Sequence, residues 1–272
     1  SNKYLCAFAT CDGCMKLWDS RNSEPCFLWR CSSTFNDEKT PLLFTSNDFE
    51  QEGSTNYQSH IITGRGSDEI CVWDLTTQRL VCEYISNSLV KEYNKQVSAM
   101  SIHPSDPNVI VVGYSNGLIT SLDTRAPAST LNSSITSYSS TVSNVSLSFS
   151  LPGEKIISLT KNTNGGDILY AATTKGNAVV WNTTSGMITT SYLSRKYGIS
   201  SFNVHQMLPL IAYSNKTQPP SIVSTQGKVF MEMNSPLVPA NSLVTFHPIF
   251  PFVTFAAPTG ELTSYNIVVS HC

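Results

Sequence analysis

Four cysteines near the start of the chain have the side chains best suited to chemistry. Cys11 and Cys14 flank Asp12-Gly13, and Cys26 and Cys31 follow a short way downstream. Four thiolates form a common tetrahedral zinc site. Asp-Gly between two alternating segments, however, is a strong hairpin signal, and such a hairpin places its flanking side chains opposite each other. We therefore favour a hairpin with unligated thiols and expect no metal and no other cofactor, with zinc as the alternative.

No other constellation in the sequence predicts catalysis. No Ser-His-Asp order and no nucleophile elbow are present, and the carboxylate pairs Asp37-Glu38 and Glu50/Glu52 lie in a polar stretch typical of a solvated loop. Gly64-Arg65-Gly66 and Asn164–Asp167 are glycine-rich but lack the following helix that a phosphate-binding loop needs. We therefore predict that the protein is not an enzyme.

Composition narrows the class of protein further. Charged residues make up only 13% of the 272 residues, and the formal net charge is −2. This balance lacks the basic patch expected of a nucleic-acid-binding protein. No apolar run reaches the roughly 18 residues of a membrane span. The eight cysteines are irregularly spaced, which is typical of reduced thiols, so we expect a cytoplasmic protein.

Internal repeats give the strongest indication of the fold. The stretch from Ser242 predicts three short strands, Ser242–Phe246, Phe252–Ala256 and Leu262–Ile267, separated by turns. The same frame occurs from Ser98 and from Ser200. Each copy has a histidine after its first strand and a proline four residues later; these histidines are His103, His205 and His247. Almost no helix is expected, because no window sustains a helical period.

A second recurring feature closes the third strand of each unit. Trp-Asp pairs are complete at Trp18-Asp19 and Trp73-Asp74. Degenerate pairs include Leu122-Asp123 and Trp181-Asn182, and the later pairs recur every 42 residues. A period near 42 with a terminal Trp-Asp resembles the WD repeat, whose unit is one blade of a β-propeller.

The resemblance predicts an all-β WD-repeat β-propeller over residues 1–272, with six recognisable blades of a seven-bladed ring. The first unit begins at a second strand, so we expect its N-terminal blade to lie upstream. Long steps between units predict surface insertions at about 32–59 and 129–150, where Ser, Thr and Asn dominate.

In such a ring the repeated side chains have structural roles. The aromatic residue of each Trp-Asp pair is expected to fill space between blades. The three histidines are related by rotation and lie far apart, so each is expected to make a turn hydrogen bond rather than to join a common site.

Four stretches indicate a closer family resemblance. They are SNDFEQ (Ser46–Gln51) before IITGRGSDEICVWD, VSAMSIHPSDPNVIVVGYSNGLITSLDTR, GISSFNVHQMLPLIAYSN and NSLVTFHPIFPFVTFAAPTGELTSYNI. In this order they resemble the C-terminal propeller of the Raptor family, the scaffold subunits of TOR complex one. The Ser-rich segment 129–150 and the low charge depart from that family.

The resemblance implies a non-catalytic scaffold in the regulation of TOR kinase signalling and of nutrient-responsive growth. Its partners would be proteins of a TOR-type kinase assembly, with recruitment to the lysosome or vacuole surface. The alternative is a WD-repeat adaptor for ubiquitin ligation, trafficking or chromatin. Partners of WD rings usually bind the face carrying the turns between second and third strands, where we expect Arg65 and Lys175 to lie as candidate contacts.

Overall fold

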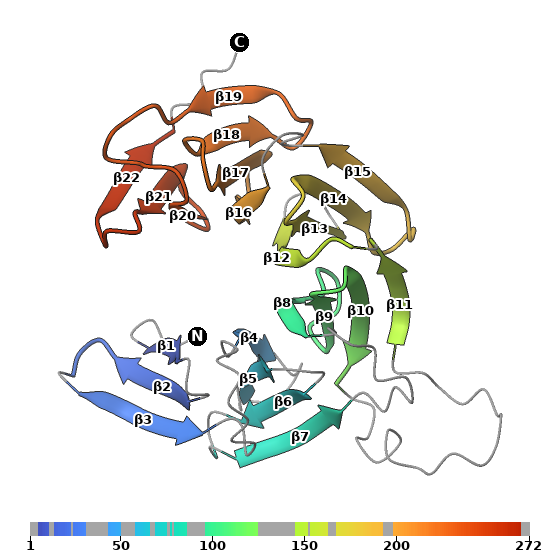
Figure 1. Ribbon diagram of the computed structural model, residues 1–272. Helices are drawn as coiled ribbons and strands as arrows, with labels where there is room; N and C mark the ends of the chain where they lie inside the picture. The colour runs from blue at the N-terminus through green and yellow to red at the C-terminus, as the bar shows by residue number, and fades with distance from the viewer. Residues whose placement is uncertain are drawn as a thin grey trace.

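The structure, a computed structural model, is built from β-strands joined by turns. It describes residues 5–10, 14–22, 24–30, 43–49, 58–65, 69–74, 77, 79–85, 96–124, 145–151, 153–162, 167–192 and 198–267. Within these ranges every regular element is a strand, and the strands form six antiparallel sheets, here called sheets I to VI (Figure 1). The all-β prediction is confirmed.

The first three sheets contain the following strands. Sheet I has β1 (Leu5–Ala9), β2 (Cys14–Asp19) and β3 (Pro25–Arg30). Sheet II has β4 (Leu43–Phe49), β5 (Gln58–Arg65), β6 (Glu69–Asp74) and β7 (Arg79–Ile85). Sheet III has β8 (Val97–Ile102), β9 (Val109–Tyr114), β10 (Leu118–Asp123) and β11 (Val145–Ser150).

The last three sheets repeat this plan. Sheet IV has β12 (Ile156–Asn162), β13 (Ile168–Thr173), β14 (Asn177–Asn182) and β15 (Ile188–Tyr192). Sheet V has β16 (Ile199–Val204), β17 (Leu210–Asn215), β18 (Ser221–Ser224) and β19 (Val229–Glu232). Sheet VI has β20 (Leu243–Phe246), β21 (Phe252–Ala256) and β22 (Leu262–Asn266).

The sheets follow one another around a common centre in chain order (Figure 1). Their first strands line the inside and pack in succession, β4 on β8, β8 on β12, β12 on β16 and β16 on β20. The strands β7, β11, β15 and β19 lie at the periphery. This arrangement is the predicted propeller-like fold, and six of its sheets are present.

An apolar core fills each interface between consecutive sheets from II to VI. The second strands show why. All six residues of β17 are buried, and so are five of the six in β13, because a sheet lies against each of their faces. In β21, by contrast, buried residues alternate with more exposed ones. Only one face of sheet VI is covered by the described residues.

One backbone hydrogen bond recurs in four sheets and shows that they share a frame. The residue after the third strand donates its N–H to the carbonyl of the residue just before the second strand. The pairs are Thr124 to Asn108 (2.8 Å), Thr183 to Asp167 (2.8 Å), Thr225 to Pro209 (3.0 Å) and Ile267 to Pro251 (2.7 Å). The repeat inferred from the sequence is therefore a structural repeat.

Both ranges expected to be insertions contain strands where the structure describes them. Strand β4 and the first residues of β5 lie within 32–59, and β11 lies within 129–150. In β11 serine occupies every second position, which is the alternation of a strand rather than the composition of a loop. Residues 31–42, 50–57 and 125–144 lie outside the described residues.

Candidate interaction face

Histidine closes the turn between the first and second strands in sheets III, V and VI. In each case the imidazole Nδ1 accepts hydrogen bonds from the backbone N–H groups two and three residues ahead. The donors are Ser105 (3.2 Å) and Asp106 (3.3 Å) for His103, Met207 (3.0 Å) and Leu208 (3.1 Å) for His205, and Ile249 (3.1 Å) and Phe250 (3.0 Å) for His247. The predicted turn hydrogen bonds are confirmed.

His205 also joins two sheets. Its side chain is fully buried, and Nε2 lies 2.9 Å from the carbonyl oxygen of Phe250 in sheet VI. Because the carbonyl only accepts, Nε2 must carry the proton while Nδ1 accepts. From the other side, the Asn162 amide of sheet IV donates to the carbonyl of His205 at 2.9 Å. These contacts connect sheets IV, V and VI along one face of the molecule.

A related contact connects sheets III and IV. The hydroxyls of Ser105 and Thr184 donate to the two carboxylate oxygens of Asp167, and these bonds lower the pKa of Asp167. Burial lowers the pKa of His103, although the nearby carboxylates of Asp106 and Asp167 act in the opposite direction. The histidines thus belong to separate turns in separate sheets and do not converge on one site.

The aromatic members of the Trp-Asp pairs have three different environments. Trp181 is buried in the apolar core between sheets III and IV, as predicted. The Trp73 indole donates to the Thr63 hydroxyl at 2.9 Å, which ties β6 to β5. Trp18 is 38% exposed, so the expectation that it fills space between blades is wrong for the described part of the structure. It shares the exposed face of β2 with Lys16 because successive side chains alternate.

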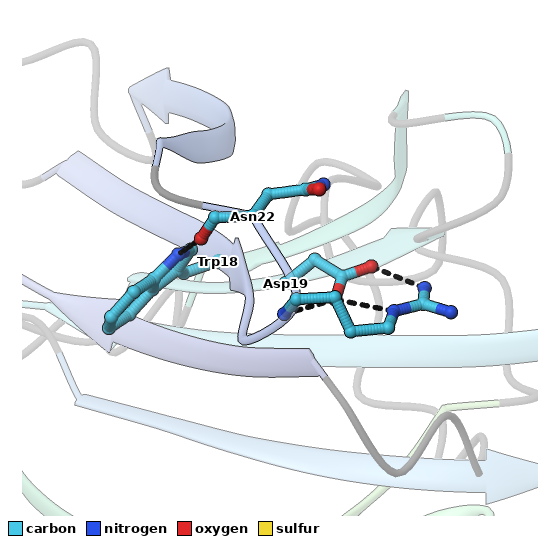
Figure 2. Close-up of polar contacts among 4 residues, drawn as sticks. Trp18, Asp19 and Asn22 are labelled. Carbon is cyan, nitrogen blue, oxygen red and sulfur yellow. Dashed lines mark hydrogen bonds and ion pairs between the residues drawn. The ribbon is translucent and has the colours of Figure 1, made fainter.

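The acidic members Asp19, Asp74 and Asp123 are the last residues of β2, β6 and β10. Figure 2 shows the end of β2, where the Trp18 indole donates to the Asn22 carbonyl at 2.6 Å and Arg21 lies against Asp19. Hydrogen bonds from the Arg21 side chain and backbone lower the pKa of Asp19 to about 2. Asp74 accepts from the Thr77 hydroxyl at 2.8 Å.

Asp123 ends β10, where it is half-buried opposite Val109. These aspartates therefore lie at strand ends and fit a structural role.

The opposite face carries the turns between second and third strands, together with the connections that enter each sheet. We call it the turn face. Lys175 lies there, exposed, in the turn between β13 and β14. Arg65 is the last residue of β5 and so lies at the same edge of sheet II, although its side chain is outside the described residues. Both positions are where the sequence predicted them, and their contact with a partner stays a prediction.

The turn that carries Lys175 is held by a polar cluster. Glu154, in the connection into sheet IV, accepts hydrogen bonds from the Thr173 hydroxyl and the Asn177 amide, both at 2.7 Å. The Thr174 N–H donates to the Lys155 carbonyl at 3.0 Å. These bonds fix both ends of the turn that carries Lys175. Rigidity lowers the entropy cost of binding.

The equivalent turn in sheet III is also fixed. Gly117 has a φ of 88°, a left-handed conformation that favours glycine. A Cβ there would lie 2.0 Å from the Leu151 carbonyl oxygen, so no other residue fits. The Leu151 N–H donates back to the Gly117 carbonyl at 2.9 Å.

Several charged side chains are exposed on the turn face. Among the residues whose exposure the structure describes, Lys155, Lys175, Lys216 and Glu261 are exposed on it. Within the described ranges, no three His, Cys, Asp or Glu side chains gather as a metal site would require. The exposed lysines of this face can form charge-assisted hydrogen bonds with a partner's acidic groups.

The cysteine hairpin lies partly outside the described residues, which include neither Cys11 nor Cys31. Cys14 and Cys71 are buried and Cys6 is exposed, and none of these three forms a disulfide. Glu154 and Asn162, which hold neighbouring segments together, were not found by sequence reasoning. Each is a single polar residue in a serine- and asparagine-rich chain, so no sequence signal distinguishes it.

Comparisons with known proteins support the fold alone. No protein-family model and no curated protein matches the chain. Among solved structures, the crystal structure of Raptor from Chaetomium thermophilum matches 99% of this chain with a TM-score of 0.75 at 16% sequence identity. The chain spans 23% of the length of that Raptor chain.

In all, 1366 chains of solved structures match, so the fold is widely shared and does not by itself select a function. Among the described residues, no helix is long and apolar enough to cross a membrane.

Proposed function

We propose that this protein is a non-catalytic interaction scaffold that acts as the propeller of a Raptor-like subunit in a TOR-type kinase assembly. The observation that carries the proposal is the structural match to Raptor over 99% of the chain. The low identity of 16% leaves the partner to be identified by experiment. The protein would act in the cytoplasm and at the membrane surfaces to which the assembly is recruited.

The repeat supports a further sheet beyond the six. In sheet V, Leu210, Ala212 and Ile222 pack against sheet VI. The corresponding face of sheet VI exposes Leu243 by 66% and Phe252 by 40%, and such an apolar face is typical of a covered surface. A seventh sheet of the same kind would cover it.

Affinity capture from the source organism tests the proposal. The tagged protein is expected to recover a TOR-type kinase from extracts, whereas an unrelated propeller carrying the same tag should not. Recovery of a ubiquitin ligase, a trafficking coat or a chromatin complex without the kinase would support the adaptor alternative instead. A hydrolase or transferase activity that co-purifies with the homogeneous protein would contradict the scaffold role.

A further inference from the structure

Polar contacts join consecutive sheets at three junctions on the face opposite the turn face. Between sheets IV and V the Asn162 amide donates to the His205 carbonyl, and between sheets V and VI His205 Nε2 donates to the Phe250 carbonyl, both at 2.9 Å. Asn162 and His205 are buried. Between sheets III and IV, by contrast, the hydroxyl of Ser105 donates to the carboxylate of Asp167, and Ser105 is exposed to solvent. The junction of sheets III and IV therefore depends on a group that an enzyme can reach.

The repeat explains why this junction differs from the others. The residue two positions after the histidine is Ser105 in sheet III, Met207 in sheet V and Ile249 in sheet VI. All three are exposed in turns with the same histidine hydrogen bonds. Of the three, only Ser105 has a hydroxyl, and that hydroxyl binds the neighbouring sheet. One side chain thus combines an exposed nucleophilic oxygen with a contact between sheets.

A phosphate on this oxygen would reverse the sign of the contact. The Ser105 and Thr184 hydroxyls donate to Asp167 and lower its pKa, so Asp167 is ionised at neutral pH. A phosphoserine has no hydroxyl to donate and carries a charge of roughly −1.5 to −2 at pH 7. Asp106 adds a second carboxylate in the same turn. Burial lowers the pKa of His103, so this histidine is a poor source of compensating positive charge. The hydrogen bond would become a contact between like charges.

We propose that Ser105 is a phosphorylation site and that its modification loosens the junction between sheets III and IV. A protein kinase would transfer the γ-phosphoryl group of ATP to Ser105 Oγ. The bond from this phosphorus to the leaving ADP breaks as the new Oγ–P bond forms, and the hydroxyl proton passes to the catalytic base of the kinase. Thr184 is the weaker candidate, because it lies in the same sheet as Asp167 and its bond joins no second sheet.

Phosphopeptide mapping tests whether the site is used. The tagged protein, purified from the source organism with phosphatases inhibited, is expected to yield a peptide that carries phosphate on Ser105. Detection of this peptide only in its unmodified form, under growing and under starved conditions alike, would overturn the assignment. Phosphate on Thr184 but not on Ser105 would overturn it as well.

Urea unfolding tests the effect on the junction. Phosphoserine incorporated at position 105 during translation should raise the unfolding equilibrium constant about tenfold, since a dianion then faces Asp167. Phosphoserine in place of Thr259, which is exposed in the turn between β21 and β22, is the matched control and should leave the constant unchanged. Ser105→Ala loses only the hydrogen bond and should have a smaller effect than phosphoserine at the same position.

Asp167→Asn distinguishes repulsion from a general disturbance of the turn. Its amide can donate to the phosphate, so in this background phosphoserine at position 105 should raise the unfolding constant about twofold or less. An equal rise with Asp167 and with Asn would overturn the proposed mechanism, as would a phosphoserine effect no larger than that of Ser105→Ala. If far-ultraviolet dichroism shows that the phosphoserine protein is unfolded, Ser105→Glu gives the same comparison with a smaller charge.

Discussion

The turns at His205 and His247 have the same local geometry but different surroundings. In both, Nδ1 accepts two backbone N–H groups at 3.0–3.1 Å. His205 is fully buried, and its Nε2 reaches the carbonyl of Phe250 in the next sheet. His247 is exposed, because no described residue covers that side of sheet VI.

The difference separates two sources of stability in this fold. The histidine turn is local, since it requires only a histidine and the two residues ahead of it. Burial and the bond across sheets come from the neighbouring sheet. The loss in the free energy of unfolding on substituting matched residues of the two turns or strands should therefore differ most where packing against the neighbouring sheet contributes most.

The largest difference is expected between two phenylalanines of β21. Phe255 is 1% exposed and packs between sheets V and VI, whereas Phe252 is 40% exposed on the opposite face. Phe255→Ala should lower the free energy of unfolding by about 3–5 kcal/mol. Phe252→Ala should cost about 1 kcal/mol or less. Urea unfolding of both variants measures this, and equal losses would mean that sheet VI is not held by sheet V as described.

The two histidines should show a smaller difference. His205→Ala removes an acceptor for two N–H groups and a donor to Phe250, at a cost of about 3 kcal/mol. His247→Ala loses only the local turn bonds and should cost about 1 kcal/mol.

His205→Asn sharpens this test, because its short amide can accept from the turn but cannot reach Phe250. In thermal unfolding, the melting temperature of His205→Asn should lie between those of His205→Ala and the wild type. An Asn variant as stable as wild type would argue against the bond between sheets.

The smallest effect is expected at the end of β2, in sheet I. The pKa of Asp19 is lowered from 3.8 to about 2, so its ionised form is favoured by folding. Its contribution to stability is fully present above pH 3.8 and is lost as the pH falls through about 2. Arg21→Ala should flatten the pH dependence of unfolding over this range, whereas Lys16→Ala should not. An unchanged slope in Arg21→Ala would show that Arg21 does not set the pKa.

Much of this fold could be predicted from the sequence because local sequence features define its repeat. The three recurring histidines each act over a few residues, and all three close the turns where the sequence indicated. The strands of sheet VI agree with the predicted ranges to within one residue.

The predictions that were wrong concern strand assignment and burial, both of which depend on packing between sheets. Strands β4 and β11 were assigned to insertions because polar composition hid their alternation. Trp18 was expected to be buried, but burial of a third-strand aromatic depends on a neighbouring sheet that the local sequence does not specify. The positions of Arg65 and Lys175 could be predicted from turn order, whereas the support of the Lys175 turn by Glu154 could not. That support spans two segments and requires the packed structure.

The most direct test of the interaction-scaffold account compares two lysines in an affinity-capture experiment. Lys175 lies on the turn face between β13 and β14, and Lys16 lies on β2; both side chains are exposed. Charge reversal at Lys175 should reduce recovery of the main partner about tenfold or more, because it replaces an attractive contact with a partner's acidic group by a repulsive one. Lys16→Glu should recover that partner as wild type does. Equal recovery by both variants would contradict the assignment of partner binding to the turn face.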